Sequence, residues 1–488
     1  MLDLALIRSE PERVARALAR RGVTAEAVDA ALQLDQRWAQ RDGVREALRH
    51  RRRRASEEVA RARTEGRDAS ELEAAGRQVA DDLAAIEAEM ADLETRRAAA
   101  LAALPNLPAT EAPDKAVDPA APFEPAAPFE PAAPSEPAAP SEPAVPSEPA
   151  AGAAGYPRTT PPWPKPFAPL PHWDLLEMLR LVHKGGGPAG RGFVTWRGGG
   201  ARLIRALVNF MLDVHTRECG YEEVRAPAVA SRAALTGSAH LPLLEDKMYV
   251  IVGATGPSPL QPANGEACSA GPCAPRIETR GGQAPALRSP SLADFFLAPR
   301  AEPHLANLYA GEILDAARLP IRLACAGPAF RREAGGGRGL LRLHQFDTVE
   351  LYTFAAPEQE EEELARAVRA AETILERLGV PHRRSLRPAP ALSHAAAKTT
   401  DLGVWAPGMN EWLAVAALST FTDYQARRTD TRYRDAGGRA RFVHTLGGAA
   451  VALPHLVAAL LENGQEADGT VRLPPALEPY FGEQALRA

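Results

Sequence analysis

The sequence predicts an α+β protein in which a long two-helix arm precedes a separate domain of mixed helices and strands. Residues 25–103 contain no proline and are rich in alanine, glutamate, arginine and leucine, which favours long helices. Residues 121–149 repeat a proline-rich hexapeptide that separates this region from the rest of the chain. From residue 168 onward, helical and strand-like patterns alternate, which indicates one globular domain.

The composition of the chain also predicts its domain boundaries. We expect a helical arm domain over residues 1–110, a proline-rich linker over 111–167 and a globular domain over 168–488. A Gly/Pro-rich insertion interrupts the globular domain at 252–290. Because frequent proline favours polyproline II, the linker is expected to be a semi-rigid spacer that leaves arm and globular domain only loosely oriented.

The arm is expected to consist of two antiparallel helices that reverse at residues 63–70. Apolar residues of the second helix recur at spacings of four and three, as in the seam of a coiled coil. They are Val79, Leu83, Ile86, Met90 and Leu93. The first helix carries a less regular set, Leu34, Trp38, Val44, Leu48, Ala55 and Val59. Two helices of roughly 35 residues make an arm on the order of 50 Å long.

A run of basic residues, "RHRRRR", lies on the first arm helix toward the tip. Its arginines are Arg49, Arg51, Arg52, Arg53 and Arg54. Such a run is consistent with a solvated helix face. It is equally consistent with contacts to the phosphates of a nucleic acid, because clustered arginine on an exposed rod is the electrostatic feature that such binding requires.

Charge and cysteine content limit the class of protein. The net charge of −5 is small for 488 residues, so a polyanion must be held by a local basic patch. Four cysteines do not form a disulfide framework at this length, which favours the reducing cytoplasm. We expect neither a signal peptide nor a membrane-spanning helix. Cys268 and Cys273 in the insertion have no second pair of ligands nearby, so we expect no metal site.

The segment "AFRREAGGGRGLLRLHQFDTVEL", residues 329–351, places arginines on both sides of a glycine-rich loop. Two strands joined by such a loop can hold a nucleotide, with Arg331 facing the α-phosphate and Phe346 offering a ring for adenine. A polar hairpin with a satisfied His344 explains these residues equally well.

The wider segment "PAFRREAGGGRGLLRLHQFDTVEL" resembles motif 2 of class II aminoacyl-tRNA synthetases in the seryl-tRNA synthetase form. Further matches follow in the family's order along nearly the whole chain, apart from linker and insertion. They include "MLDLALIRSEPERV", "LPNLP", "GARLIRALVNFMLDVH", "GYEEVRAP" as motif 1, "AAAKTTDLGVWAPG", "DYQARR" and "LLENGQEADG". The chain is therefore similar to this family throughout both predicted domains.

The resemblance implies a fold, a reaction and partners. The fold is a coiled-coil arm plus a class II domain with a six-stranded antiparallel sheet and flanking helices. The reaction converts serine and ATP to seryl-adenylate and pyrophosphate, with Mg²⁺ on the phosphates, and then transfers serine to the 3′ end of tRNA. The partners are a serine-type tRNA with a long variable arm and a second copy of the chain, and a heterodimer with an intact paralogue is conceivable.

The resemblance also implies roles for individual residues. Arg331 corresponds to the α-phosphate arginine and Arg342 to a second motif 2 arginine, so both are candidate catalytic residues. Glu333 and Phe346 match the ATP site, and Glu350 matches a carboxylate near the substrate pocket.

Other positions depart from the family's pattern. The family's T-x-E is "RAE" here, so Arg300 replaces the threonine while Glu302 persists. In "LAVAALST" the family's glutamate has become Ala414, and in motif 3 His455 stands at the place of the γ-phosphate arginine. Lost polar partners cost about 1–3 kcal/mol each, so we expect serine to bind poorly. The motif 2 loop is also about four residues shorter than the family's.

Three interpretations remain. The chain is a divergent member that binds tRNA and ATP with serine activation lost or altered. Alternatively, it activates a different carboxylate for tRNA or another carrier, with Arg300 binding a negative group. As a third possibility, it is a working serine–tRNA ligase whose altered residues are compensated elsewhere.

Overall fold

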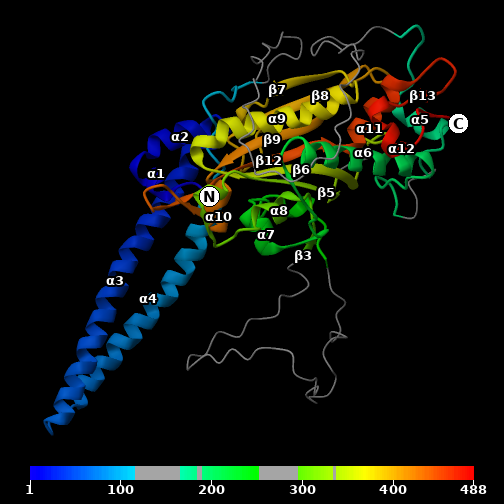
Figure 1. The fold of residues 1–488 in the computed structure, drawn as a ribbon. Helices are drawn as coiled ribbons and strands as arrows, with labels where there is room; N and C mark the ends of the chain where they lie inside the picture. Colours follow the sequence, from blue (N-terminus) through cyan, green and yellow to red (C-terminus); the bar gives the residue numbers. More distant parts are fainter. Residues whose placement is uncertain (116–164, 184–188, 252–294, 334–336) are drawn as a thin grey trace, which may run out of the picture.

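The computed structural model describes residues 1–115, 165–183, 189–251, 295–333 and 337–488. Most of the linker and the whole predicted insertion lie outside these ranges, as do Cys268 and Cys273. The arm consists of α3 (Ala25–Thr64) and α4 (Ser70–Ala103), which run side by side away from the body (Figure 1). Two short helices, α1 (Leu4–Ser9) and α2 (Pro11–Ala19), precede them at the base.

The predicted helical seam is present on α4. Val79, Leu83, Met90 and Leu93 are buried against α3, and Ile86 is partly buried. On α3, Leu48 is buried beside Val79 and Leu83, as expected. The expectation for Val44 is wrong, since 41% of this residue is exposed. The arm is therefore held by an apolar seam that α4 supplies more regularly than α3.

A buried carboxylate at the base of the arm was not anticipated. Asp35 of α3 is only 2% exposed and pairs with Arg8 of α1 at 2.6 Å and with Arg97 of α4 at 2.9 Å. The hydrogen bond from Arg8 and the bond from Arg97 lower the pKa of Asp35 below its usual value. Three helices are thus joined at one ionised group.

The body is built on a mixed sheet whose strand order is β1-β5-β6-β12-β9-β8-β7. The strands are β1 (Glu222–Val224), β5 (Ile321–Phe330), β6 (Gln345–Ala355), β7 (His382–Leu386), β8 (Lys398–Ala406), β9 (Glu411–Thr422) and β12 (His444–Ala452). Neighbouring strands from β5 to β7 are all antiparallel, which confirms the predicted six-stranded antiparallel sheet. The structure adds β1, which pairs in parallel with β5.

Helices cover one face of this sheet. They are α5 (His172–Met178), α6 (Gly199–Arg217), α9 (Glu360–Arg377), α11 (Leu453–Gly464) and α12 (Glu478–Phe481). The apolar sides of α6, α9 and α11 share one core with Val349 and Leu351 of β6. Figure 1 shows α9 and α6 lying along the sheet. α6 and α9 alternate buried and exposed positions as the 3.6-residue period of a half-buried helix requires, whereas α11 has no exposed position.

Smaller elements complete the body. They are β2 (Val229–Ser231), α7 (Arg232–Gly237), β3 (Phe295–Leu297), α8 (Glu302–Ala306), β4 (Ile313–Asp315), α10 (Tyr424–Thr429), β10 (Arg432–Arg434), β11 (Ala440–Phe442), β13 (Val471–Arg472) and β14 (Ala485–Leu486). Of the helices in the described ranges, none is long and apolar enough to cross a membrane.

The arm base docks on the other face of the sheet. Ile7, Val14 and Leu18 of the N-terminal helices lie in one core cluster with Tyr352 and Phe354 of β6. Arg21 reinforces the contact by donating to the backbone carbonyls of Leu392, Ser393 and Ala396, and burial lowers the pKa of Arg21 to about 10. The expectation of a loosely oriented arm is therefore wrong, because a shared core sets its direction.

Candidate functional site

The site begins where β5 and β6 end, at the hairpin predicted to hold a nucleotide. Ala329 pairs with Phe346 and Phe330 pairs with Gln345, after which the backbone N–H of Arg331 donates to the carbonyl of His344 at 2.8 Å. The ladder thus continues one step past the strand and brings Arg331 to the rim of the sheet. Residues 334–336 of the loop lie outside the described ranges.

Arg331 lacks a close counter-charge in this structure. Its side chain is 46% exposed, and its contact with Glu333 is 3.9 Å long. Burial of part of the side chain, followed by the nearby charge of Arg300, lowers the pKa of Arg331. A guanidinium beside another guanidinium favours an anion, and a phosphate suits its paired donors.

Arg300 lies between two buried carboxylates. Its Nη1 donates to Glu302 Oε2 at 2.9 Å, and its Nε lies 3.5 Å from Glu350 Oε1. The side chains of Glu302 and Glu350 are only 5% and 1% exposed. Burial raises the pKa of Glu350, whereas Arg300 opposes this rise. The structure therefore brings together all three residues that the sequence assigned to the substrate pocket from this region.

Glu302 is held in place by Gln425, a residue that was not predicted from the sequence. Gln425 of α10 donates to Glu302 Oε1 at 2.8 Å. The amide oxygen of Gln425 accepts from Tyr352 at 2.7 Å and from Thr445 at 3.2 Å, so its orientation is determined. Gln425 is part of "DYQARR", a matched segment whose role in the site was not apparent from its letters.

A second unanticipated residue, His240, lies beside the same pocket. Its Nδ1 is 2.9 Å from Ser238 Oγ. Burial lowers the pKa of His240 to about 4, so the ring is neutral at pH 7 and adds no charge to the pocket. A lone histidine in an irregular segment gives no periodic signal, which is why sequence patterns missed it.

The face of β6 connects the proposed nucleotide end with the carboxylates. Phe346, Thr348 and Glu350 alternate along the strand and so share one face of the sheet. Phe346 is partly buried and lines a hollow of about 190 Å³ together with Phe193 and Pro454. Next to it, Phe193 stacks on His344 at 5.2 Å between ring centres. An aromatic ring is thus available to a planar base.

His455 is hydrogen-bonded to the backbone of strand β9. Its Nδ1 lies 2.5 Å from the backbone carbonyl oxygen of Ala414 on β9, so this nitrogen carries the proton and donates it. Burial lowers the pKa of His455, and the neutral ring then has an Nε2 that can only accept. Two positions that depart from the family's pattern therefore contact each other.

Arg342 has an unusual backbone but no established place in the cluster. Its φ is +57°, a left-handed conformation that costs a non-glycine residue about 1–3 kcal/mol. Its side chain is exposed. Within the described residues, no hydrogen bond or ion pair joins it to Arg331, Arg300 or Glu350. Of the two candidate catalytic arginines, only Arg331 faces the carboxylates here.

A buried histidine, His172, contacts the end of the loop between β5 and β6. His172 of α5 accepts from the backbone N–H of Leu340 at 3.1 Å and donates from Nδ1 to Glu462 of α11 at 2.9 Å. Glu462 also accepts from the backbone N–H groups of Gly408 and Met409. This network links the loop to α11, and neither residue was identified from the sequence.

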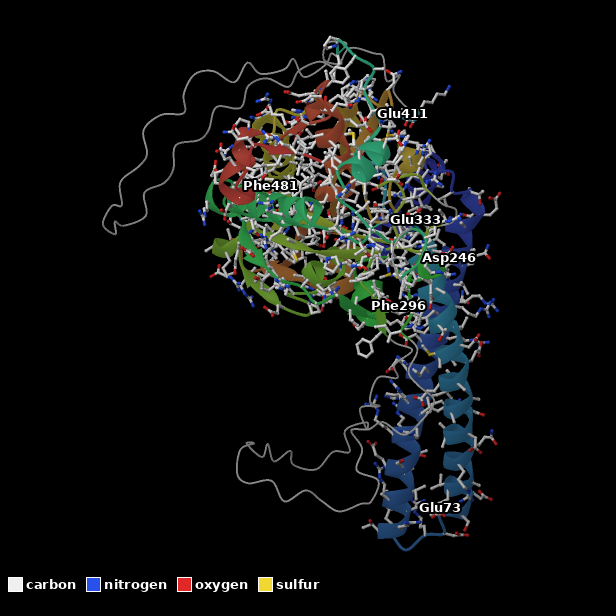
Figure 2. All side chains as sticks on the ribbon, turned by 90° about the vertical axis from the view of Figure 1, so that its right-hand side faces the viewer. Glu73, Asp246, Phe296, Glu333, Glu411 and Phe481 are labelled. Carbon is white, nitrogen blue, oxygen red and sulfur yellow. The ribbon has the colours of Figure 1, made fainter. Side chains whose placement is uncertain are left out.

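The arginines of the run on the arm differ in whether they form ion pairs. Arg49 donates to Glu46 at 3.0 Å and to Glu87 of α4 at 2.9 Å, so its charge is largely matched. Arg51, Arg52, Arg53 and Arg54 are exposed, and along the described arm none of them forms an ion pair. Figure 2 shows the arm projecting from the body, with Glu73 near its far end. Four of the five predicted contacts are thus available to a partner.

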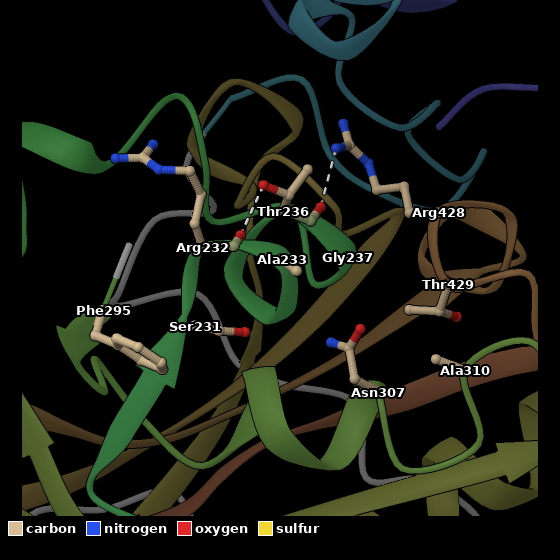
Figure 3. A pocket seen from close by; sticks show the side chains of 10 residues that line it. All are labelled: Ser231, Arg232, Ala233, Thr236, Gly237, Phe295, Asn307, Ala310, Arg428 and Thr429. Atoms are coloured by element: carbon tan, nitrogen blue, oxygen red, sulfur yellow. Dashed lines mark hydrogen bonds between the residues drawn. The ribbon is translucent and has the colours of Figure 1, made fainter. Parts of the chain in front are cut away.

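A larger hollow of about 700 Å³ lies between α7, α8 and α10 (Figure 3). Its lining includes Ser231, Phe295 and Asn307. Arg428 crosses its rim and donates to the carbonyl of Thr236 at 3.2 Å. None of the residues predicted for the site lines this hollow. The volume of a hollow by itself therefore does not identify the candidate site.

Comparison with known proteins covers both regions of the chain. A family model for the seryl-tRNA synthetase N-terminal domain matches residues 1–108, and one for the tRNA synthetase class II core domain (G, H, P, S and T) matches 287–464. The serine–tRNA ligase of Gemmatimonas aurantiaca is 37% identical over 499 residues, with 100% of each chain covered. That of Pelotomaculum thermopropionicum is 35% identical, with 99% of each covered. The structure of seryl-tRNA synthetase from Pyrococcus horikoshii complexed with ATP aligns with a TM-score of 0.74 and 27% identity, over 100% of this chain and 99% of that chain.

Proposed function

The chain belongs to the seryl-tRNA synthetase family, and on this premise we propose that it binds ATP and tRNA while its activation of serine is lost or altered. The observation that carries the proposal is the contact between His455 and the carbonyl of Ala414. It leaves a neutral acceptor nitrogen where the family's pattern has an arginine, and an acceptor repels phosphate oxygens. Loss of one charge-stabilising donor slows a reaction by roughly 10²–10³-fold.

Binding of the nucleotide itself is supported by residues that match the family. Arg331 is half-exposed and short of a counter-charge, Glu333 lies beside it, and Phe346 lines a hollow. A named relative was solved with ATP bound. Mg²⁺ at such sites is usually bound by one or two carboxylates together with the phosphates of the nucleotide, so the nucleotide would supply part of its ligands.

The tRNA would be gripped by the arm. Four exposed arginines without acidic partners lie on a rod that extends away from the body. The family's tRNA has a long variable arm, whose phosphates such a rod can reach. The rigid docking of the arm base favours this role, because a defined direction places the tRNA end relative to Arg331.

We also infer a homodimer in the cytoplasm, as expected for this family. Among the described residues between 229 and 313, six large apolar side chains are exposed in the single chain: Val229, Leu243, Leu244, Val250, Leu308 and Ile313. A second copy would cover part of such a surface. The heterodimer with a paralogue has no observation in its favour and is not proposed.

Two other functions were considered. An active serine–tRNA ligase is favoured by the full-length similarity to proteins of that name and by the matching residues Arg331, Glu333, Phe346 and Glu350. The second function is activation of a different carboxylate whose additional negative group would bind Arg300. It is disfavoured, because Arg300 already pairs with Glu302 and Glu350.

The deciding experiment is serine-dependent exchange of pyrophosphate into ATP, with ATP binding measured separately. We expect bound ATP but no exchange above background, and His455→Arg alone should not restore exchange because Arg300 and Ala414 remain. Exchange within tenfold of an ordinary family enzyme would show that serine is activated and would refute the proposal.

A further inference from the structure

Two buried carboxylates in the pocket share a single guanidinium. Arg300 hydrogen-bonds Glu302 at 2.9 Å but approaches Glu350 Oε1 only to 3.5 Å. Both oxygens of Glu302 have donors, one from Arg300 and one from Gln425. Glu350 Oε2 accepts from the backbone N–H of Glu302 at 2.9 Å. Such an arrangement is a receptor for a cation, and this chain supplies the cation itself.

One acceptor in this cluster remains unmatched. Among the described residues, Glu350 Oε1 is a buried oxygen without a hydrogen-bond partner. A buried acceptor without a donor costs about 1–3 kcal/mol, and more when it is charged. An ammonium group would satisfy it, but the guanidinium of Arg300 lies over this oxygen.

Both arginines of the pocket already have carboxylates near them before any ligand arrives. Arg300 lies between Glu302 and Glu350, and Arg331 lies 3.9 Å from Glu333. His240 next to them is neutral at pH 7. A ligand ammonium would therefore add a third cation beside two arginines. It would also have to displace the guanidinium of Arg300, which the chain holds at an effective concentration on the order of millimolar or higher.

We propose that Arg300 is an internal cation that occupies the amino-acid subsite, so that the subsite excludes ligands with an α-ammonium group but admits the same acyl group without it. This inference rests on the proposed function, in which the pocket is the amino-acid end of the ATP site. Arg300 is then the residue that determines specificity, through occupation of a receptor that Glu302 and Glu350 still form.

The test compares two adenylate mimics on the full chain by calorimetry. One is the sulfamoyl-adenosine mimic of seryl-adenylate, and the other is its 3-hydroxypropanoyl counterpart without the ammonium group. The unchanged protein should bind the second at least tenfold more tightly. Arg300→Thr should reverse this preference, whereas Arg300→Lys keeps a cation in place and should retain it. An unchanged preference in Arg300→Thr overturns the proposal.

A second measurement does not depend on the nucleotide site. Ethanolamine hydrochloride should raise the Tm of Arg300→Thr relative to equal sodium chloride, and it should not do so for the unchanged protein or for Arg300→Lys. If Arg300→Thr does not fold, Arg300→Gln removes the charge with less change in size and is used in both measurements. Absence of the ethanolamine shift in the uncharged variant overturns the inference. AMP titrated in parallel reports on the proposed nucleotide site. A failure of the proposed function would appear as absent AMP binding and can thus be told apart from a failure of the inference about Arg300.

Discussion

The distal half of the arm and the proposed amino-acid pocket are both rich in arginine, yet they present it in opposite ways. Arg51 to Arg54 are exposed and unpaired along the described arm, whereas Arg300 is held between Glu302 and Glu350. On an exposed helix a charge remains hydrated and free to meet a partner, while in a buried pocket it must be matched within the protein. The same residue type is therefore left available to a partner in one region and is paired within the protein in the other.

Charge reversal in the distal half of the arm should have the largest effect. Replacing Arg51, Arg52, Arg53 and Arg54 by glutamate removes four phosphate contacts and adds repulsion, so we expect affinity for a tRNA with a long variable arm to fall at least a hundredfold. Filter binding at several salt concentrations measures it. For the unchanged protein, log K against log salt should have a slope of roughly −3 to −4, from about 0.7–0.9 per neutralised phosphate.

Arg49 is the matched control for this experiment. Because it already pairs with Glu46 and Glu87, Arg49→Ala should weaken tRNA binding much less than Arg52→Ala does. Equal effects of the two changes, or a flat salt dependence, would show that the run is only a solvated helix face.

The base of the arm has the inverse arrangement of the pocket. Here one carboxylate, Asp35, is shared by two arginines, whereas in the pocket one arginine lies between two carboxylates. Asp35→Ala removes the carboxylate shared by Arg8 and Arg97 and leaves Arg97, which is 14% exposed, paired only with the exposed Glu94. We expect a loss of about 3 kcal/mol in unfolding free energy. Thermal denaturation of the full chain measures this change. Asp92→Ala, which breaks an exposed pair with Arg96, should leave the Tm unchanged; a similar loss there would contradict the argument.

The same carboxylate predicts a dependence on pH. The pKa of Asp35 is lowered in the folded protein, so its stabilising contribution is present above its unfolded pKa of about 4 and is lost as the pH falls further. The stability of the unchanged protein should therefore drop more steeply below about pH 4 than that of Asp35→Asn. Parallel curves for the two proteins would show that Asp35 carries no such linkage.

The smallest effect is expected behind the pocket. Tyr352→Phe removes the hydroxyl that donates to the amide oxygen of Gln425 at 2.7 Å and leaves Thr445 as the donor to that oxygen, which should lower stability by about 1 kcal/mol. Tyr480→Phe, whose hydroxyl bonds the partly exposed Asp213, is the control and should change the Tm less. A larger loss for Tyr480→Phe would show that the network around Glu302 is not tightly constrained.

Much of the fold could be predicted because its signals are local. The seam of Val79, Leu83, Met90 and Leu93 repeats on one helix. The six-stranded antiparallel sheet was implied by the resemblance to a known family, which short ordered motifs carry. The pairing of Asp35 could not be predicted, because Arg8 and Arg97 lie 27 and 62 residues away along the chain. Nothing in a linear pattern links residues at such distances.

The sequence by itself determined which residue types stand at the site, including Arg331, Glu350, Arg300 and His455. Only the tertiary structure decided which of their charges and donors remain available. It turned the Nδ1 proton of His455 to the carbonyl of Ala414, and it placed Arg300 against Glu302 and Glu350 rather than toward a ligand. The physical reason is that composition specifies how many charges and donors a chain has, whereas burial and three-dimensional contact decide which of them are already paired.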